Sequence, residues 1–300
     1  FVDFCKRDHF LKIFSMGLGL SVLFIGVGIS MHLANSIGPD INSNWDNAWD
    51  FLKTQTPELS IVGTWWDPGH MIAGLAERRN FADGAHCAEP CMYNINDRIV
   101  DLGRIMATDN EAESLELIKK YQGDSPKVYW IASDDLVSKY QWLQYFGMGC
   151  DARSDQKCSL YYQLPKSDIK YDSTGQPIAV QYSDVLVIPA STPIPIYTQG
   201  KTAAIIQEVI YYDVSGQVRR ADLTNVTDFV KQYETELKIN LQPSTLTATA
   251  WISRDYSYIV MIPANLRNTV FTRMYFLEGA GLEHFKQVFR NEQVKIYEVV

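Results

Sequence analysis

The stretch 61-IVGTWWDPGHMI-72 decides how the central part of this chain is built. With the preceding Leu59 and Ser60, its first residues form a β-rich run, and residues 71–79 (MIAGLAERR) have helical character. Between them, Pro68 favours an extended backbone at Asp67, and Gly69 permits a sharp reversal. We therefore expect a strand, a turn and a helix, with two adjacent indoles and a carboxylate at the turn.

Trp65, Trp66 and Asp67 together complement a hydroxyl group. Each indole offers one N–H donor and no acceptor, and an ionised Asp only accepts, whereas a hydroxyl donates once and accepts twice. The three side chains are therefore candidates for binding a Ser or Thr side chain. The alternative is that both indoles fill the core while Asp67 caps a helix that begins near His70.

Around this stretch, residues 43–148 alternate between helical and strand-like patterns. Residues 43–58 (SNWDNAWDFLKTQTPE) predict a helix that Pro57 ends, and residues 127–133 (KVYWIAS) predict a strand. Further helices are expected around 99–106, from a capping box at 108–111 to Tyr121, and from Asp134 or Asp135 through Phe146.

Residues 160–262 differ in character, because Val, Ile, Tyr and Thr alternate in runs broken by Pro and Gly. They predict a mostly antiparallel β section, and residues 264–300 return to helix and strand. The expected fold is mixed α+β: residues 1–36 hold a cytoplasmic flank and a membrane helix, and 37–158 an α/β core. Residues 159–262 form a β-rich section, and 263–300 return to the core.

The balance of charges argues against nucleic acid as a partner. The chain has 27 Lys and Arg against 35 Asp and Glu, a formal net charge of −8, and phosphate backbones require basic surfaces. Because the chain begins at Phe1 without the layout of a signal peptide, we expect it to be a piece of a longer protein.

Residues 13–33 (IFSMGLGLSVLFIGVGISMHL) predict a transmembrane helix. The run contains no charged residue, and at about 1.5 Å per residue it spans a hydrocarbon core of roughly 30 Å. Lys6, Arg7 and Lys12 precede it and acidic residues follow it, so the positive-inside bias puts the globular part outside the cytoplasm. A buried helix of a soluble core is the alternative, but the run is apolar on all faces.

Four of the five cysteines occur in close pairs, Cys87 with Cys91 and Cys150 with Cys158. Outside the cytosol, a local disulfide within each pair is the simplest assignment, although the sequence does not exclude cross-pairing. The alternative is a zinc site at Cys87 and Cys91 with His86 and His70, but the second pair has no His beside it. No metal site is therefore expected in this chain.

The central motif, Trp65-Trp66-Asp67-Pro68-Gly69, resembles the Trp-Trp-Asp-Tyr-Gly signature of the catalytic subunit of oligosaccharyltransferase, above all its archaeal single-subunit form. That membrane enzyme performs protein N-glycosylation. The resemblance extends over nearly the whole chain and is loosest in the β-rich middle; it is carried by residues 45–58, 77–84 (ERRNFADG), 105–121 and 271–289.

The resemblance implies that Trp65, Trp66 and Asp67 contact the hydroxyl at the +2 position of an acceptor sequon, Asn-X-Ser/Thr. It also implies a helix whose Lys and apolar residue form a wall of that pocket, for which Lys139 and Leu143, after Asp135, are the best match. Pro68 departs from the family's Tyr, which puts the local turn in doubt. The spacing from Asp135 to Lys139 also differs from the expected pattern.

The resemblance further implies a dolichol-linked oligosaccharide donor and Mn²⁺ or Mg²⁺, with the catalytic acids and metal ligands in loops outside this chain. Local acids have simpler roles as loop residues or helix caps; they are Asp83, Glu89, Asp134 and Asp135. The histidines have no accompanying nucleophile, and no nucleophile elbow or phosphate loop is present. We expect the full-length protein to be the enzyme and this fragment alone to be inactive.

Two functions of different classes follow. The first is the acceptor-recognition region of an oligosaccharyltransferase, with a sequon-bearing polypeptide, a lipid-linked oligosaccharide and the membrane as partners. The alternative is a membrane-anchored extracytoplasmic interaction module in which Trp65 and Trp66 are core. The single sequon, Asn225-Val226-Thr227, could itself be a modification site.

Overall fold

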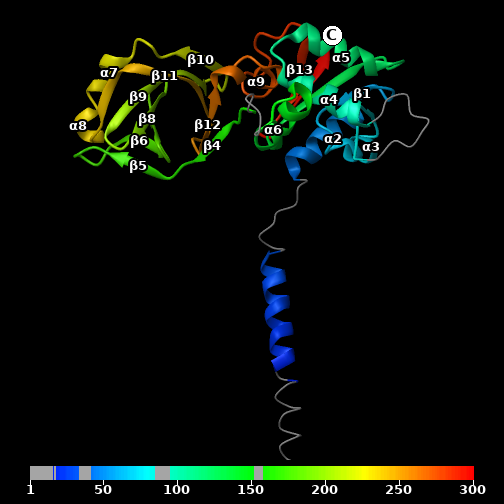
Figure 1. Ribbon diagram of the computed structural model, residues 1–300, viewed down its shortest axis with the longest axis horizontal. Helices are drawn as coiled ribbons and strands as arrows, with labels where there is room; N and C mark the ends of the chain where they lie inside the picture. The colour runs from blue at the N-terminus through cyan, green and yellow to red at the C-terminus, as the bar shows by residue number, and fades with distance from the viewer. Residues whose placement is uncertain (1–15, 17, 34–41, 85–94, 152–157) are drawn as a thin grey trace, which may run out of the picture. The chain divides into compact units, whose positions relative to one another are not determined.

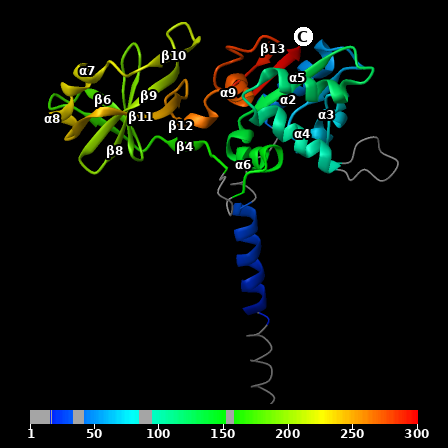
Figure 2. The same ribbon diagram turned by 45° about the horizontal axis from the view of Figure 1, so that its top comes forward.

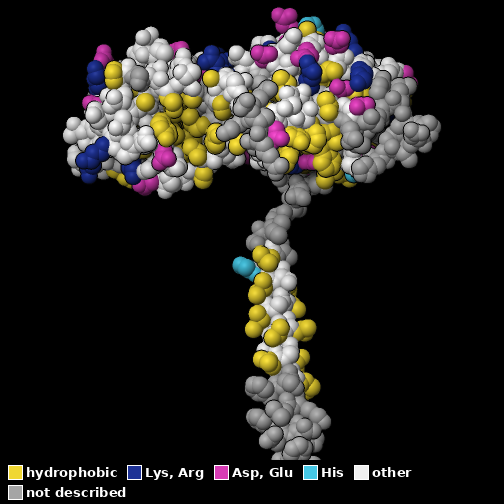
Figure 3. Space-filling model, viewed as in Figure 1, with side chains coloured by type: hydrophobic (Ala, Val, Ile, Leu, Met, Phe, Trp, Pro, Cys, Tyr) yellow, Lys and Arg dark blue, Asp and Glu magenta, His cyan; other side chains and the backbone are white. Residues whose placement is uncertain are grey.

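The computed structural model describes residues 16, 18–33, 42–84, 95–151 and 158–300. The chain divides into two units, Phe1–Ser43 and Asn44–Val300. In the first unit, residues 18–33 are helical and their apolar side chains are exposed, as Figure 3 shows. Within the described part of the chain, no helix is both long and apolar enough to cross a membrane. Residues 13–15 and 17 of the predicted span lie outside the described residues.

The second unit begins with α2 (Ser43–Gln55), whose apolar residues recur at helical spacing. Trp45, Ala48, Trp49 and Leu52 are all buried, and the Trp45 and Trp49 rings stack with centroids 4.9 Å apart. This helix confirms the one predicted over residues 43–58, which was expected to end at Pro57. Packing of such a face, more than helix propensity, stabilises a helix of this length.

A five-stranded mixed sheet carries the central motif (Figure 1). Its strands lie in the order β13 (Phe285–Arg290), β14 (Val294–Val299), β3 (Val128–Ser133), β1 (Ile61–Gly63) and β2 (Arg79–Asn80). β1 pairs in parallel with β2 and β3, whereas β14 runs antiparallel to β3. The C-terminal hairpin therefore completes a sheet that begins more than two hundred residues earlier in the chain.

Helices accompany this sheet: α3 (Gly69–Gly74), α4 (Ile95–Ala107), α5 (Glu111–Gln122), α6 (Asp135–Met148) and α9 (Val270–Tyr275). The capping box predicted at residues 108–111 named the wrong N-cap residue, Thr108, for α5. Asn110 is the N-cap of α5, and its side chain accepts from the backbone N–H groups of Ala112 and Glu113. Thr108 instead donates its hydroxyl to the Glu113 carboxylate, so the Asn side chain occupies the position that a Thr was expected to take.

A nine-stranded sheet forms the rest of the unit (Figure 2). Its strands are β4 (Tyr162–Pro165), β5 (Asp168–Tyr171), β6 (Pro177–Tyr182), β7 (Val185–Ile188), β8 (Ile194–Gln199), β9 (Thr202–Tyr212), β10 (Val218–Asp222), β11 (Asn240–Ile252) and β12 (Tyr258–Pro263). Two short helices, α7 (Thr227–Lys231) and α8 (Glu234–Leu237), precede β11. Among the described strand pairs of this sheet, only β9 with β11 is parallel.

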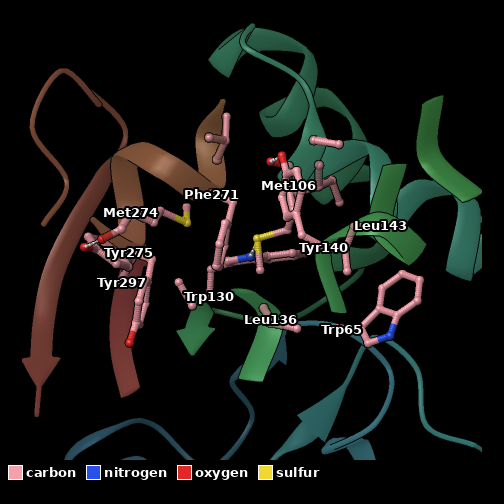
Figure 4. Close-up of a cluster of buried hydrophobic side chains, with 14 of the residues drawn as sticks. Trp65, Met106, Trp130, Leu136, Tyr140, Leu143, Phe271, Met274, Tyr275 and Tyr297 are labelled. Carbon is pink, nitrogen blue, oxygen red and sulfur yellow. Dashed lines mark hydrogen bonds between the residues drawn. The ribbon is translucent and has the colours of Figure 1, made fainter. Parts of the chain in front are cut away.

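The mixed α+β class predicted from the sequence is confirmed by the two sheets and their helices. One buried cluster includes Trp65, Trp130, Tyr140 and Phe271 (Figure 4), and it reaches Trp251 of the nine-stranded sheet. A second cluster lies within the nine-stranded sheet and includes Tyr182 and Ile205. The first cluster contains Trp65, and Trp66 packs against it, so the central motif rests on this part of the core.

Candidate functional site

β1 ends at Gly63, two residues before Trp65, which is the first indole of the motif. Trp65 is 3% exposed and belongs to the buried cluster that also contains Leu143 (Figure 4). Its ring centroid lies 6.0 Å from that of Phe146 on α6. Trp66 packs against the same cluster but is only partly buried. The two indoles therefore differ in exposure, as the turn between strand and helix permits.

The turn is tight because Gly69 has no side chain. The Gly69 N–H donates to the Trp66 carbonyl over 3.0 Å. A Cβ atom on Gly69 would lie 2.1 Å from the Ala82 carbonyl oxygen, closer than any real contact. Pro68 occupies the N-cap position of α3. The interpretation of Asp67 as a helix cap is therefore wrong: its carboxylate faces another element.

That element is α6, which contributes Lys139. Lys139 Nζ lies 2.5 Å from Asp67 Oδ2 and 3.0 Å from Asp135 Oδ2, so one ammonium group joins the motif to the first turn of α6. The three side chains are 28–38% exposed. Burial by itself lowers the pKa of Lys139, but the two carboxylates outweigh it and the pKa is raised. Lys139 is thus held charged.

The motif retains unused hydrogen-bonding groups. Among the residues that the structure describes, no acceptor reaches the indole N–H of Trp65 or of Trp66, and Asp67 accepts only from Lys139, on Oδ2. Two indole donors and one carboxylate oxygen, Oδ1, therefore have no hydrogen-bond partner among the described residues, although Trp65 itself is almost fully buried. This set can donate to a hydroxyl oxygen and accept its proton.

The structure places Leu143 differently from the other predicted site residues. Its side chain is fully buried, at 0% exposure, in the same core cluster as Trp65. Phe146 is 39% exposed and contacts the Trp65 ring. Phe146 lies on the same helical face as Lys139, two turns further on, and sequence reasoning missed it although this spacing could have indicated it.

The candidate acids and histidines are scattered. Asp83 Oδ2 lies 3.8 Å from His70 Nδ1, beside the motif's helix. His284 instead faces Glu111, at 3.5 Å. Glu89 and His86 lie outside the described residues.

Cys150 and Cys158 form a disulfide just after α6, with their Cα atoms 5.1 Å apart. Cys87 and Cys91 lie outside the described residues, as does the main part of the alternative zinc site. In the ranges that the structure describes, no three His, Cys, Asp or Glu side chains are close enough to hold a metal ion. The described residues therefore do not fit a bound metal, and no chemical step is assigned to one.

Asp134 does not cap α6 with its side chain, contrary to the simplest sequence interpretation. Burial raises its pKa to about 6, and the neighbouring Asp135 carboxylate adds to the effect. The folded state therefore binds this proton more tightly than the unfolded state does. The stabilisation is complete below pH 3.8, the ordinary value, and is lost as the pH rises through about 6.

We accordingly expect Asp134→Asn to be more stable than the parent chain at pH 7.5, by at most about 3 kcal/mol, and to differ little at pH 4. Thermal unfolding at both pH values measures this difference. Asp228→Asn, at a side chain that is 98% exposed, is the control for a surface substitution. Equal differences between Asp134→Asn and the parent at the two pH values would contradict the assignment.

Comparison with known proteins finds a partial similarity in sequence. No family model matches the chain, but part of it is similar in sequence to dolichyl-phosphooligosaccharide-protein glycotransferases. The resemblance to the oligosaccharyltransferase catalytic subunit is thereby confirmed.

Two archaeal relatives illustrate the similarity. The enzyme of Methanocaldococcus jannaschii is 29% identical over 114 residues, which are 38% of this chain and 11% of that protein. Glycotransferase 1 of Pyrococcus furiosus is 34% identical over 92 residues, which are 28% of this chain and 9% of that protein. The matches thus span about a tenth of these relatives' length.

Among solved structures, the C-terminal domain of C. jejuni PglB aligns with 86% of this chain and 100% of its own length. The TM-score is 0.49 and the sequence identity 11%.

Proposed function

We propose that this chain contains the acceptor-recognition region of an oligosaccharyltransferase, which transfers a glycan from a dolichol-linked donor to Asn in Asn-X-Ser/Thr sequons. Trp65, Trp66 and Asp67 bind the hydroxyl of the +2 residue. Lys139 fixes the carboxylate, and Leu143 supports the Trp65 ring from within the core. The region selects the acceptor, and the bond-forming chemistry belongs to other parts of the full-length enzyme.

The bridge from Asp67 through Lys139 to Asp135 is the observation that carries this proposal. Lys139 engages one oxygen of the Asp67 carboxylate and leaves the other available. The +2 hydroxyl then donates a hydrogen bond to Asp67 Oδ1 and accepts one from an indole N–H. Because Asp67 is already oriented by an ion pair, little side-chain entropy is lost when the hydroxyl binds.

Selectivity follows from the same geometry. A +2 Ala would cover the site without satisfying its donors and acceptor, at about 1 to 3 kcal/mol for each group left unpaired. One lost pair therefore accounts for a discrimination of about fivefold to 150-fold. The methyl group of a threonine would gain contact with the aromatic rings of Trp66 and Phe146.

The wider organisation is also part of the proposal. Residues 13–33 cross the membrane, and the globular part lies outside the cytoplasm. Residues 37–158 and 263–300 form the core that holds the acceptor site, and 159–262 form the β-rich section. Mn²⁺ or Mg²⁺ would bind outside this chain, where the catalytic carboxylates are expected.

Photo-crosslinking of peptides tests the proposal. A peptide with an Asn-X-Thr sequon and a photoreactive group beside its Thr should label residues near Trp65 at least tenfold more than its Asn-X-Ala counterpart. Asp67→Ala should abolish the difference, and Asp184→Ala, at an exposed residue in the turn between β6 and β7, should preserve it. In this proposal, loops outside this chain complete the site, so this chain alone should bind the peptide weakly. The assay therefore uses the peptide at millimolar concentration.

Equal labelling by the Thr and Ala peptides in the parent chain would overturn the acceptor assignment. That result would favour the alternative function, a membrane-anchored interaction module in which both indoles serve the core. A difference that survives Asp67→Ala would place the recognition of the hydroxyl elsewhere.

A further inference from the structure

The chain contains one acceptor sequon of its own, Asn225-Val226-Thr227, between β10 and α7. A sequon of this kind can carry an N-linked glycan where it lies on the surface of an extracytoplasmic domain. The sequon follows a strand of the nine-stranded sheet, whereas the motif at Trp65 follows a strand of the five-stranded sheet. The two features are therefore separate, and the proposed acceptor-binding role does not use this segment.

The two side chains that define the sequon are free in the folded chain. Asn225 is exposed in a turn, and Thr227 is partly exposed. In the part of the chain that the structure describes, neither side chain makes a hydrogen bond or an ion pair. The neighbouring Thr224 hydroxyl, by contrast, donates to the Asp222 carboxylate over 2.6 Å. A group attached to the Asn225 carboxamide would therefore break no existing contact of that side chain.

The surface around the sequon leaves room for a bulky group. The side chain of Asp228 is 98% exposed, and Phe229 is 41% exposed. Thr224, on the other side of Asn225, is exposed as well. Because a glycan is bulky and well solvated, an open surface of this kind accommodates it without displacing the core.

Buried residues hold the chain on both sides of the sequon. Leu223 is 1% exposed and Val230 is 0% exposed, and both belong to the cluster within the nine-stranded sheet. Between them, the Val226 N–H donates to the Leu223 carbonyl over 3.4 Å, and the Val226 carbonyl accepts from the Val230 N–H over 3.2 Å. Both bonds are long. The sequon can therefore open locally while Leu223 and Val230 stay in the core.

The helix that follows offers little resistance to such an opening. α7 has five residues, and its N-cap, Val226, makes no side-chain hydrogen bond to the helix. The first N–H groups of α7 therefore lack the acceptor that Ser, Thr, Asp or Asn would provide at this position. A helix this short is marginal by itself. Its first turn, which contains Thr227, can unwind and present the sequon to an enzyme.

From these observations we infer that Asn225 is a glycan-attachment site, so that this chain is itself an acceptor for an oligosaccharyltransferase. The donor is a lipid-linked oligosaccharide. Asn225 Nδ2 forms a bond to the anomeric carbon of the sugar, and the bond from that carbon to the lipid pyrophosphate breaks. The pyrophosphate leaves with the bonding electron pair, and one amide proton passes to a base of the transferring enzyme.

This inference rests on the proposed orientation of the chain, which puts the globular part outside the cytoplasm. It does not rest on the binding of a hydroxyl by Trp65, Trp66 and Asp67. The two proposals can therefore be tested separately.

Translation of the whole 300-residue chain into rough microsomes tests the inference. A fraction of the chains should gain mass that a peptide N-glycosidase removes, and the tryptic peptide of residues 221–231 should carry the modification at Asn225. Asn225→Gln and Thr227→Ala should each lower the modified fraction at least tenfold, because they remove the carboxamide at this position and the hydroxyl. Thr227→Ser keeps the hydroxyl and is the matched control; its modified fraction should stay within about threefold of the parent.

An Asn-Ala-Thr sequon appended after Val300 of the Asn225→Gln variant reports the orientation. If that sequon is modified but Asn225 of the parent chain is not, the inference is overturned and the orientation stands. If neither is modified, both are overturned. A mass gain that Asn225→Gln retains without the appended sequon would also overturn the inference. The sequon-dependent crosslinking near Trp65 should be the same in Asn225→Gln, so the acceptor-recognition proposal can fail by itself.

Discussion

Gly147→Ala is expected to lower the free energy of unfolding by about 2 to 4 kcal/mol. Gly147 lies in α6 where that helix crosses α4, and its added Cβ would lie 2.2 Å from the Arg104 backbone nitrogen and 2.3 Å from the Gly103 carbonyl carbon. Both contacts are with backbone, which no rotamer change can relieve, so the helices must separate. Overpacking of this kind typically destabilises by about 1 to 3 kcal/mol, and backbone clashes by more.

Thermal unfolding of the full chain measures the effect, and a loss of this size lowers Tm by about 5 to 15 °C. Gly74→Ala is the control, because a Cβ there meets no atom within 4 Å and Ala favours a helix. Since α6 also carries Lys139, we expect Gly147→Ala to weaken sequon discrimination as well. A Tm for Gly147→Ala equal to that of Gly74→Ala would show that the helices tolerate wider spacing.

Arg78→Met is expected to destabilise the chain by about 3 to 5 kcal/mol. Arg78 is 6% exposed and donates to four backbone carbonyls and one hydroxyl: Lys53 O at 2.6 Å, Thr56 O at 2.7 Å, Glu77 O at 3.0 Å, Ala76 O at 3.4 Å and Thr56 Oγ1 at 3.0 Å. Methionine preserves the apolar stem but leaves these oxygens without their donor, and each unsatisfied buried group is unfavourable by about 1 to 3 kcal/mol.

The neighbouring Arg79 provides the matched control, because it makes comparable contacts in a more exposed position. It pairs with Asp124 at 2.7 Å and its side chain is 42% exposed. An exposed ion pair contributes about 0 to 1 kcal/mol, so Arg79→Met should have a small effect in chemical denaturation. Similar losses for the two variants would mean that burial does not set the contribution of Arg78.

Sequence patterns predicted helices and strands well where apolar residues recurred at regular spacing or formed an unbroken run. The Trp and Leu face of α2 and the apolar run of β3 are of this kind. β11 has no such run, because Thr, Ser and Pro interrupt its apolar residues, and its pairing with β9 comes from tertiary contacts. Local patterns therefore could not indicate it.

For the candidate site, the resemblance of the central motif directed attention to Asp67 and Lys139, which the structure brings into contact. The contact joins residues 72 positions apart, a separation that no helical or strand period encodes. The contact of Phe146 with Trp65 also depends on how distant elements meet. The sequence indicates which residue types the site contains, but only the fold shows which of these residues contact one another.

The position of β14 determines when the domain can fold during synthesis. This strand lies between β13 and β3, and its register pairs Val294 with Ser133 and Val299 with Val128. Until the ribosome has added residue 299, β3 lacks one of its neighbours, and the sheet beneath the motif stays open at a hydrophobic edge. The nascent chain must therefore be shielded from wrong pairings until β14 emerges.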